Sequence, residues 1–156
     1  MISQLPDMRK TALIAFGLAA ITVACAQEPD LHLDLKDKTR PSFSFSGRSL
    51  ATAFEILEVP RSEPLSKINP YTVKGRTVWR ISMSRRVKAA DWPSVIYGEV
   101  PNGLSQGVPE QGPPPKLTQG KLYLARIVGE QGFRCDFFFE VRNNLVVNVT
   151  DKVFGP

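Results

Sequence analysis

Three runs near the carboxyl terminus decide the fold: KLYLARIV (residues 121–128), FRCDFFFEV (133–141) and LVVNVT (145–150). Each run is rich in β-branched or aromatic residues, which favour strands. GEQG and RNN separate the runs, and Gly and Asn are the residues that tight turns between strands prefer. The spacing therefore predicts an antiparallel meander of three strands.

Alternation within FRCDFFFEV predicts which of its side chains enter the core. Successive side chains of a strand point to opposite faces of the sheet. The expected core-facing set is Phe133, Cys135, Phe137, Phe139 and Val141. Cys135 is therefore expected to be an inert thiol that faces a core lined with phenylalanine.

Strand patterns continue upstream of the meander. SFSFS (42–46) and TVWRISM (77–83) both alternate apolar with polar residues. SLATAFEILEV (49–59) fits either a strand or a helix, because its apolar residues also recur at three- and four-residue spacing. We interpret its second half, residues 53–59, as a strand, since its neighbours are strands and Pro60 ends it.

The composition of the whole chain agrees with this strand pattern. The 156 residues include 13 Pro and 11 Gly, which indicates many turns and few long helices. Six or seven short strands with no clear helix predict one all-β domain over residues 42–156. The expected architecture is an antiparallel β-sandwich of immunoglobulin-like or fibronectin-like type, with a small β-barrel as the second choice.

A leader of the secretory type precedes this domain. Arg9 and Lys10 supply a basic segment, and the next stretch, TALIAFGLAAITVA (11–24), carries no charge. A membrane-spanning helix, the alternative, needs roughly 18 apolar residues or more. We therefore interpret residues 1–26 as a signal peptide. Residues 27–41 are then a tether or an edge strand.

The end of the leader leaves two processing routes open. Residues 22–25, TVAC, resemble a bacterial lipobox, in which the Cys becomes the lipidated first residue, although Thr22 stands where Leu is usual. Ordinary signal peptidase would instead cut after Ala26 and discard Cys25. We favour lipidation of Cys25 and an outer-membrane lipoprotein that faces the periplasm. A soluble periplasmic or secreted protein is the alternative.

Positive charge is concentrated in one segment. Residues 61–88 hold eight basic side chains and one acidic side chain, a net charge of +7, within a chain whose net charge is +5. In an exported protein such a segment suits anionic lipid, lipopolysaccharide or an acidic envelope protein. Solvated strand faces are the plainer explanation, and no recognition motif indicates nucleic acid. The candidate contacts are Arg76, Arg80, Arg85, Arg86 and Lys88.

The stretch from Tyr97 to Tyr123 is rich in Pro and Gly. Five of each lie between Gly98 and Gly120, so we expect turns and polyproline segments rather than a regular element. One interpretation is a stiff ridge that a partner contacts, with aromatic contacts from Trp92, Tyr97 and Tyr123. The other interpretation is a long, well-packed crossover between the two sheets.

This part of the chain resembles a pattern found in small bacterial secreted proteins and lipoproteins. The pattern is a Trp strand (TVWRI, 77–81), then Tyr97-Gly98, then Pro-x-Gly (101–103), and a proline-rich loop that leads into a Tyr strand. The resemblance covers roughly residues 76 to 128. It implies an envelope location and a β fold, and it implies no activity and no catalytic residues.

Catalysis has little support in the sequence. The one histidine, His32, lies in the expected tether, and no metal cluster, phosphate loop or dinucleotide fingerprint is present. We therefore predict no catalytic residue, cofactor or metal, and a non-catalytic binding or structural module of the cell envelope. The alternative is a small periplasmic enzyme that uses loop carboxylates such as Asp91, Glu99 or Glu110.

Lipid labelling tests the interpretation of Cys25. Wild-type protein made in a bacterium should take up labelled fatty acid, and the Cys25→Ser protein should take up none, because the Cys25 thiol is the attachment point. The measurement is the label recovered with each purified protein. Equal label in the two proteins, or no label in either, would show that Cys25 is not an anchor.

Overall fold

The computed structural model describes residues 31–34, 41–61, 64–69, 72–129 and 134–154. The expected signal peptide with Cys25 and most of segment 27–41 lie outside these residues, and so does Phe133. Within the described ranges, no helix has the length and apolar character that a membrane crossing needs.

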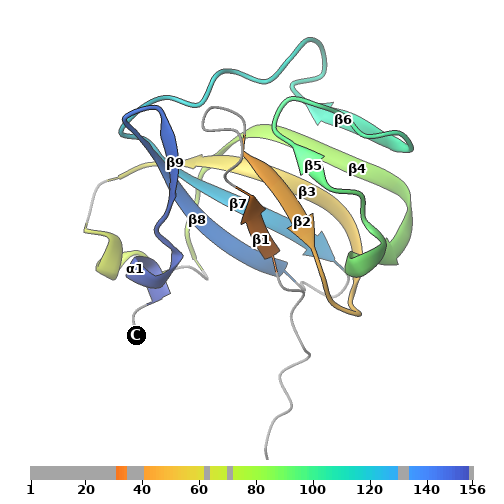
Figure 1. The fold of residues 1–156 in the computed structure, drawn as a ribbon, viewed down its shortest axis with the longest axis horizontal. Coiled ribbons are helices and arrows are strands. Elements are labelled where there is room, and N and C mark those ends of the chain that lie inside the picture. The colour runs from red at the N-terminus through yellow and green to blue at the C-terminus, as the bar shows by residue number, and fades with distance from the viewer. Residues whose placement is uncertain (1–30, 35–40, 62–63, 70–71, 130–133, 155–156) are drawn as a thin grey trace, which may run out of the picture.

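The described residues form an all-β structure of two antiparallel sheets, as expected (Figure 1). The small sheet has the order β1-β2-β5, with β1 at Leu31–Asp34, β2 at Ser42–Phe45 and β5 at Val95–Ile96. The large sheet has the order β6-β4-β3-β7-β8-β9. Its strands are β6 (Leu104–Val108), β4 (Arg76–Lys88), β3 (Leu50–Val59), β7 (Leu122–Gly129), β8 (Arg134–Arg142) and β9 (Leu145–Asn148). In the part of the chain that is described, neither sheet closes into the barrel that was the second choice.

The carboxyl-terminal meander is confirmed. β7 pairs with β8 and β8 with β9, both antiparallel. Asn143 and Asn144 form the turn between β8 and β9 with φ values of 50° and 59°. Asn tolerates this left-handed conformation, which a two-residue hairpin of type I′ requires at both positions. The dipeptide therefore sets the register of the last strand.

The predicted strand over residues 53–59 is confirmed, and β3 begins three residues earlier, at Leu50. The register against β4 and β7 shifts between Ala51 and Ala53, which marks a bulge. Beyond the bulge both faces of the strand are buried: Phe54 belongs to one core cluster and Leu57 to another. The bulge and the two-sided burial together produce the helix-like spacing of apolar residues.

The interface between the sheets is an aromatic cluster. Phe43 of β2 packs against Phe54 of β3 and Phe139 of β8, with ring centroids 5.0 and 6.0 Å apart. Phe45 packs against Phe54 at 5.2 Å, and Phe54 meets Trp79 edge-on at 6.2 Å. Such pairs add about 0.5–1.5 kcal/mol each to the burial of apolar area. The sheets are thus joined face to face, as in a sandwich.

A second core lies on the outer face of the large sheet. The alternation in β8 places Phe138 there, opposite Phe137 and Phe139, as predicted. Two short helical segments cover this core at one end of the sheet: η1 (Leu65–Lys67), through Leu65, and α1 (Thr150–Phe154), through Val153 (Figure 1). A third short segment, η2 (Ala89–Asp91), follows β4.

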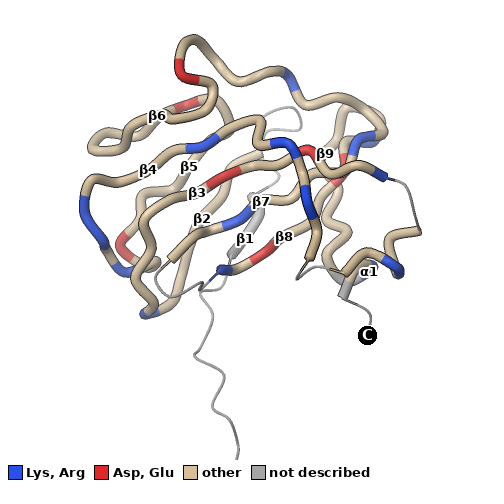
Figure 2. The backbone as a smooth tube through the Cα atoms, turned by 180° about the vertical axis from the view of Figure 1, so that it is seen from behind, with Lys and Arg blue, Asp and Glu red and all other residues tan. Residues whose placement is uncertain are grey.

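The rest of the outer face carries a row of alternating charges. In the strand register, Arg80 of β4 lies opposite Glu55 of β3, Glu55 lies opposite Arg126 of β7, and Arg126 lies opposite Asp136 of β8. Figure 2 shows this row as alternating blue and red segments across the four strands. Arg126 donates two hydrogen bonds, of 2.7 and 2.9 Å, to the carboxylate of Asp136. These bonds raise the pKa of Arg126. We call these four residues the charge row.

Asp136→Asn tests the charge row. The substitution leaves the half-buried Arg126 without its carboxylate, so the free energy of unfolding should fall by about 2 kcal/mol. Denaturant unfolding measures this value. Glu55→Gln is the control in the same row and should cost less than about 1 kcal/mol, because it lacks the bidentate bond. If both substitutions lower the free energy of unfolding equally, the bidentate Arg126–Asp136 pair does not stabilise the fold more than the other members of the charge row.

Candidate functional site

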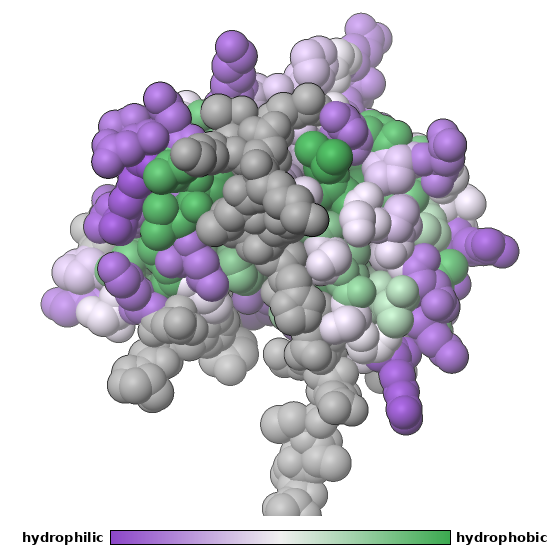
Figure 3. Space-filling view, in the orientation of Figure 1, coloured by the Kyte–Doolittle hydropathy of each residue, from purple (hydrophilic) through white to green (hydrophobic). Residues whose placement is uncertain are grey.

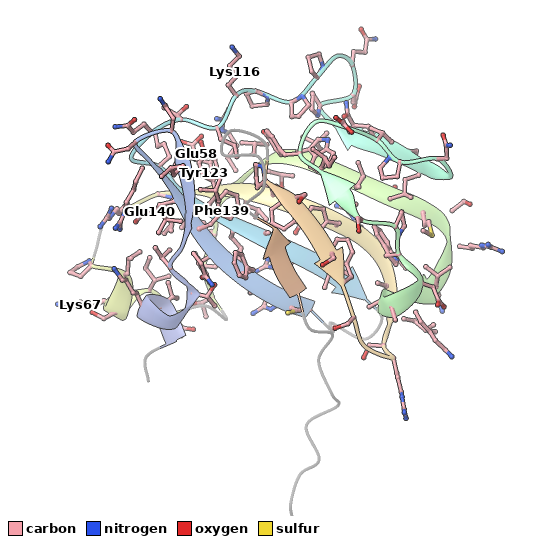
Figure 4. All side chains as sticks on the ribbon, viewed as in Figure 1. Glu58, Lys67, Lys116, Tyr123, Phe139 and Glu140 are labelled. Atoms are coloured by element: carbon pink, nitrogen blue, oxygen red, sulfur yellow. The ribbon has the colours of Figure 1, made fainter. Side chains whose placement is uncertain are left out.

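A hollow of about 450 Å³ opens where three strands of the large sheet begin or end. We call it the strand-end hollow. Its lining comes from the end of β3, the start of β4 and the segment that enters β7: Glu58, Val59, Pro60, Arg61, Arg76, Gly120, Lys121 and Leu122. Figure 4 labels Glu58 together with Tyr123 and Glu140 at this end of the molecule. In Figure 3 hydrophilic side chains gather over the same end.

Glu58, which lines the hollow, binds two cationic side chains. Arg76 Nη2 donates to Glu58 Oε2 at 2.9 Å, and Lys121 Nζ donates to Oε1 at 2.8 Å. The bond from Lys121, followed by the bond from Arg76, holds the pKa of Glu58 below its ordinary value. The carboxylate therefore stays ionised and holds Arg76 and Lys121 on either side of it.

Strand register explains why these residues meet. Glu58 lies opposite Arg76 on β4 and opposite Tyr123 on β7. Gly75 lets the chain pass close to β3 just before Arg76. A Cβ at this position would lie 2.8 Å from the Glu58 carbonyl oxygen, closer than real contacts allow. Gly75 is therefore needed for β4 to start beside Glu58.

A buried glutamate supports the rim of the hollow. Glu140 of β8 is only 1 % exposed and lies opposite Leu122. Arg142 binds its Oε2 through Nε at 2.7 Å and Nη2 at 2.6 Å. Arg61 Nη1 lies 3.1 Å from Glu140 Oε1 and forms an ion pair with it, but the geometry does not meet that of a hydrogen bond. Arg61 is thus held at the rim by charge, and its N–H groups are not directed at Glu140 Oε1.

A second hollow of about 370 Å³ adjoins the first and shares Val59 and Pro60 with it. Two lysines, Lys67 and Lys74, line this neighbouring hollow. The two linings together hold five basic residues and one acidic residue: Arg61, Lys67, Lys74, Arg76 and Lys121, with Glu58. A concave surface with one predominant charge sign concentrates ions of the opposite sign. This arrangement is suited to an anionic ligand.

The structure divides the predicted basic contacts between three places. Arg76 lines the strand-end hollow, and Arg80 belongs to the charge row. The remaining three lie at the other end of β4, near the exposed Arg48 of the turn between β2 and β3. We call this group the basic end: Arg48, Arg85, Arg86 and Lys88. Figure 2 shows blue segments gathered there.

The basic end and the strand-end hollow are electrostatically separate. Leu50 lies opposite Lys88, and Glu58 lies opposite Arg76. Eight residue steps of β3 therefore separate the two groups, which is roughly 25 Å. The Debye length at physiological salt is about 8 Å. Charges at one end consequently have little influence at the other.

The predicted aromatic contacts lie inside the molecule and not on its surface. Trp92, Tyr97 and Tyr123 are 5, 4 and 2 % exposed. Tyr97 Oη donates to the Pro115 carbonyl at 2.7 Å, and the Tyr123 hydroxyl accepts from the Thr118 amide at 2.9 Å. Their rings belong to the core, and the two tyrosines reach the surface only as part of the lining of a small pocket of about 50 Å³. The hydroxyls of Tyr97 and Tyr123 anchor the proline-rich loop.

The loop itself differs from the prediction in two ways. Leu104–Val108 forms the edge strand β6, which the sequence did not indicate because Gly and Pro surround two apolar residues. The predicted crossover between the sheets is also limited to residues 97–103, from β5 to β6, and the chain from β6 to β7 then stays within the large sheet and passes β4 and β3. Gln106 fixes its start: it accepts from Trp79 Nε1 and donates to the Pro109 and Gly112 carbonyls.

The carboxylates proposed for an enzyme lie apart from the two hollows. Asp91, Glu99 and Glu110 are exposed and follow β4, β5 and β6 respectively. None of them lines either hollow. Among the residues with described positions, no group of three or more His, Cys, Asp and Glu is placed to hold a metal ion. His32 is part of β1, and its side chain is outside the description.

Sequence reasoning missed four members of the site, Glu58, Lys121, Glu140 and Arg142. Two of them did leave a signal. Glu58 continues the alternation of Phe54 and Ile56, so it occupies a core-side position at the end of a strand. Glu140 directly follows three consecutive phenylalanines, Phe137–Phe139, and precedes Val141. A carboxylate at either position needs a basic or hydrogen-bonding partner when it is buried. The sequence does not identify that partner, because it depends on which strands pair.

Comparison with known proteins adds no relative: no family model, curated protein or solved structure matches this chain.

Tyr97→Phe tests the anchoring of the loop. Burial, with a smaller contribution from Tyr123, raises the pKa of Tyr97 above its ordinary value of about 10. The folded state therefore favours the neutral phenol, and the wild type should lose stability as pH rises from about 10 towards the folded pKa. The variant should lose less over this range. At neutral pH it should be about 1 kcal/mol less stable, because the bond to Pro115 is gone.

Denaturant unfolding at neutral and alkaline pH measures both effects. Tyr123→Phe, which removes the bond from Thr118 and keeps Tyr97, is the matched variant. If the wild type and Tyr97→Phe lose the same stability between neutral and alkaline pH, ionisation of Tyr97 is not the cause of the loss.

Proposed function

We propose that this protein is a bacterial cell-envelope lipoprotein whose β-sandwich is a non-catalytic module that binds an anionic group of an envelope component. The observation that carries the proposal is the strand-end hollow with its neighbour, where five basic side chains and one acidic side chain line adjoining concavities. The ligand group is a phosphate or carboxylate of lipopolysaccharide or an acidic envelope protein.

The contacts of Glu58 support an anion-binding role for this hollow. Arg76 and Lys121 already hold a carboxylate between them at hydrogen-bonding distance. Their side chains are 74 and 52 % exposed, so a ligand can reach them from solvent. Arg61, which also lines the hollow, is 47 % exposed. An arginine pair and a lysine are the donors that protein sites use for phosphate.

The proposed location rests on the leader. The uncharged stretch 11–24 and the lipobox-like residues 22–25 support export and attachment through Cys25. We place the protein at the outer membrane, facing the periplasm. A soluble periplasmic or secreted protein remains the alternative, and there the hollow would serve the same ligand class.

The finer fold class also belongs to this proposal. Face-to-face packing of two antiparallel sheets supports a sandwich used as a rigid scaffold. The split of six and three strands differs from the four and three strands of a constant-type immunoglobulin domain. We therefore propose a sandwich whose loops at the strand ends carry the binding site, in the manner of immunoglobulin-like and fibronectin-like domains.

Pyrophosphate is a small probe for the hollow. The wild type should bind it in titration calorimetry, with affinity that falls as salt rises. A variant with Arg61→Gln, Arg76→Gln and Lys121→Gln, the hollow variant, should bind about tenfold more weakly or worse, because three charged donors are lost.

The matched control removes the same charge from the basic end through Arg48→Gln, Arg85→Gln and Arg86→Gln. This basic-end variant should bind pyrophosphate within about twofold of the wild type, given the separation of several Debye lengths. Equal losses in both variants would show a diffuse charge effect, and no binding by the wild type would remove the proposed site.

A further inference from the structure

The described chain begins at the basic end. Leu31, the first residue of β1, lies opposite Phe45. Phe45 comes three residues before Arg48, and the turn that follows it is bonded to Ala89 and Ala90, directly after Lys88. In Figure 1 the start of β1 accordingly lies at the end of the sandwich where β2 turns into β3. The segment that leads to Cys25 therefore enters the domain here.

A bulge in β4 brings two of the cations to this end. Ala51 lies opposite Val87 and Ala53 opposite Ser82, so four residues of β4 face only Thr52 on β3. Arg85 and Arg86 belong to these four, and both are exposed. A bulge redirects side chains away from the regular ladder. Asp91, in η2, is the acidic residue nearest to the group in sequence, and the four cations together with Asp91 have a net charge of +3.

The length of chain before β1 limits how far this end can be from Cys25. Six residue steps connect Cys25 with Leu31. Even a fully extended chain of this length reaches at most about 20 Å. A lipid on Cys25 therefore brings the basic end, and not the strand-end hollow, next to the headgroups.

We propose that the basic end docks on the anionic headgroups of the membrane that holds Cys25, and that the strand-end hollow consequently faces away from that membrane. This proposal rests on the lipid anchor in the proposed function. Each cation near an anionic lipid surface contributes about a fivefold change in affinity. The exposed Leu50, opposite Lys88, adds one apolar side chain to the same surface.

Vesicle binding tests the docking surface without the anchor. Cys25→Ser protein, collected from the periplasm after export, is mixed with vesicles of phosphatidylethanolamine and phosphatidylglycerol and sedimented. It should bind these vesicles and not vesicles of phosphatidylcholine alone. The basic-end variant should bind about a hundredfold more weakly, because three cations are lost. The hollow variant, which loses the same charge, should stay within about threefold of the parent protein.

Three results would overturn the proposal: no binding to anionic vesicles, equal losses in the two variants, or a larger loss in the hollow variant. Thermal unfolding of both variants confirms that they are folded. The lipid-labelling experiment reports separately on the anchor. If the protein takes up no labelled fatty acid but still binds anionic vesicles through the basic end, only the lipoprotein assignment is wrong. If it takes up label but does not bind the vesicles through the basic end, only the docking surface is wrong.

Discussion

The packing of Phe43 against Phe54 and Phe139 is the interaction on which the rest of the structure depends. β2 is the central strand of the small sheet, and its two phenylalanines meet the large sheet directly. Without this contact the small sheet would consist of β2 and two short flanking strands, and Phe43 and Phe45 would be exposed instead of packed against the large sheet. The contact also closes the inner face of the large sheet, so that charged side chains are left to its outer face and its ends.

That constraint determines where charge can lie. The outer face is divided between the apolar cluster under η1 and α1 and the charge row, in which each charge is next to its opposite. Unbalanced positive charge remains at the two ends of β3 and β4. The basic segment of the sequence is therefore not one surface in the folded protein. It supplies two sites at opposite ends and one member of a neutral row between them.

The sequence predicted the features that depend on neighbours along the chain. The meander, the alternation of Phe137, Phe138 and Phe139 and the all-β class follow from local spacing. The strand-end hollow could not be predicted, because Glu58, Arg76 and Lys121 meet only through the pairing of three strands. β6 was missed for a related reason: its strand conformation comes from pairing with β4 and not from its own composition. Burial of Tyr97 and Tyr123 likewise depends on the loop that folds over them.

The position of Glu58 means that an anion entering the hollow would have to displace the Glu58 carboxylate from Arg76 and Lys121. Its carboxylate already occupies the space between Arg76 and Lys121, so an entering anion replaces an internal ligand instead of filling an empty site. A singly charged group gains little by this exchange, since it offers the two cations no more than Glu58 does. A group with two or more charges gains more. Under the proposed function, the number of charges on a ligand would decide which ligand binds, and the sheet beneath the hollow would need no shape complementarity to select it.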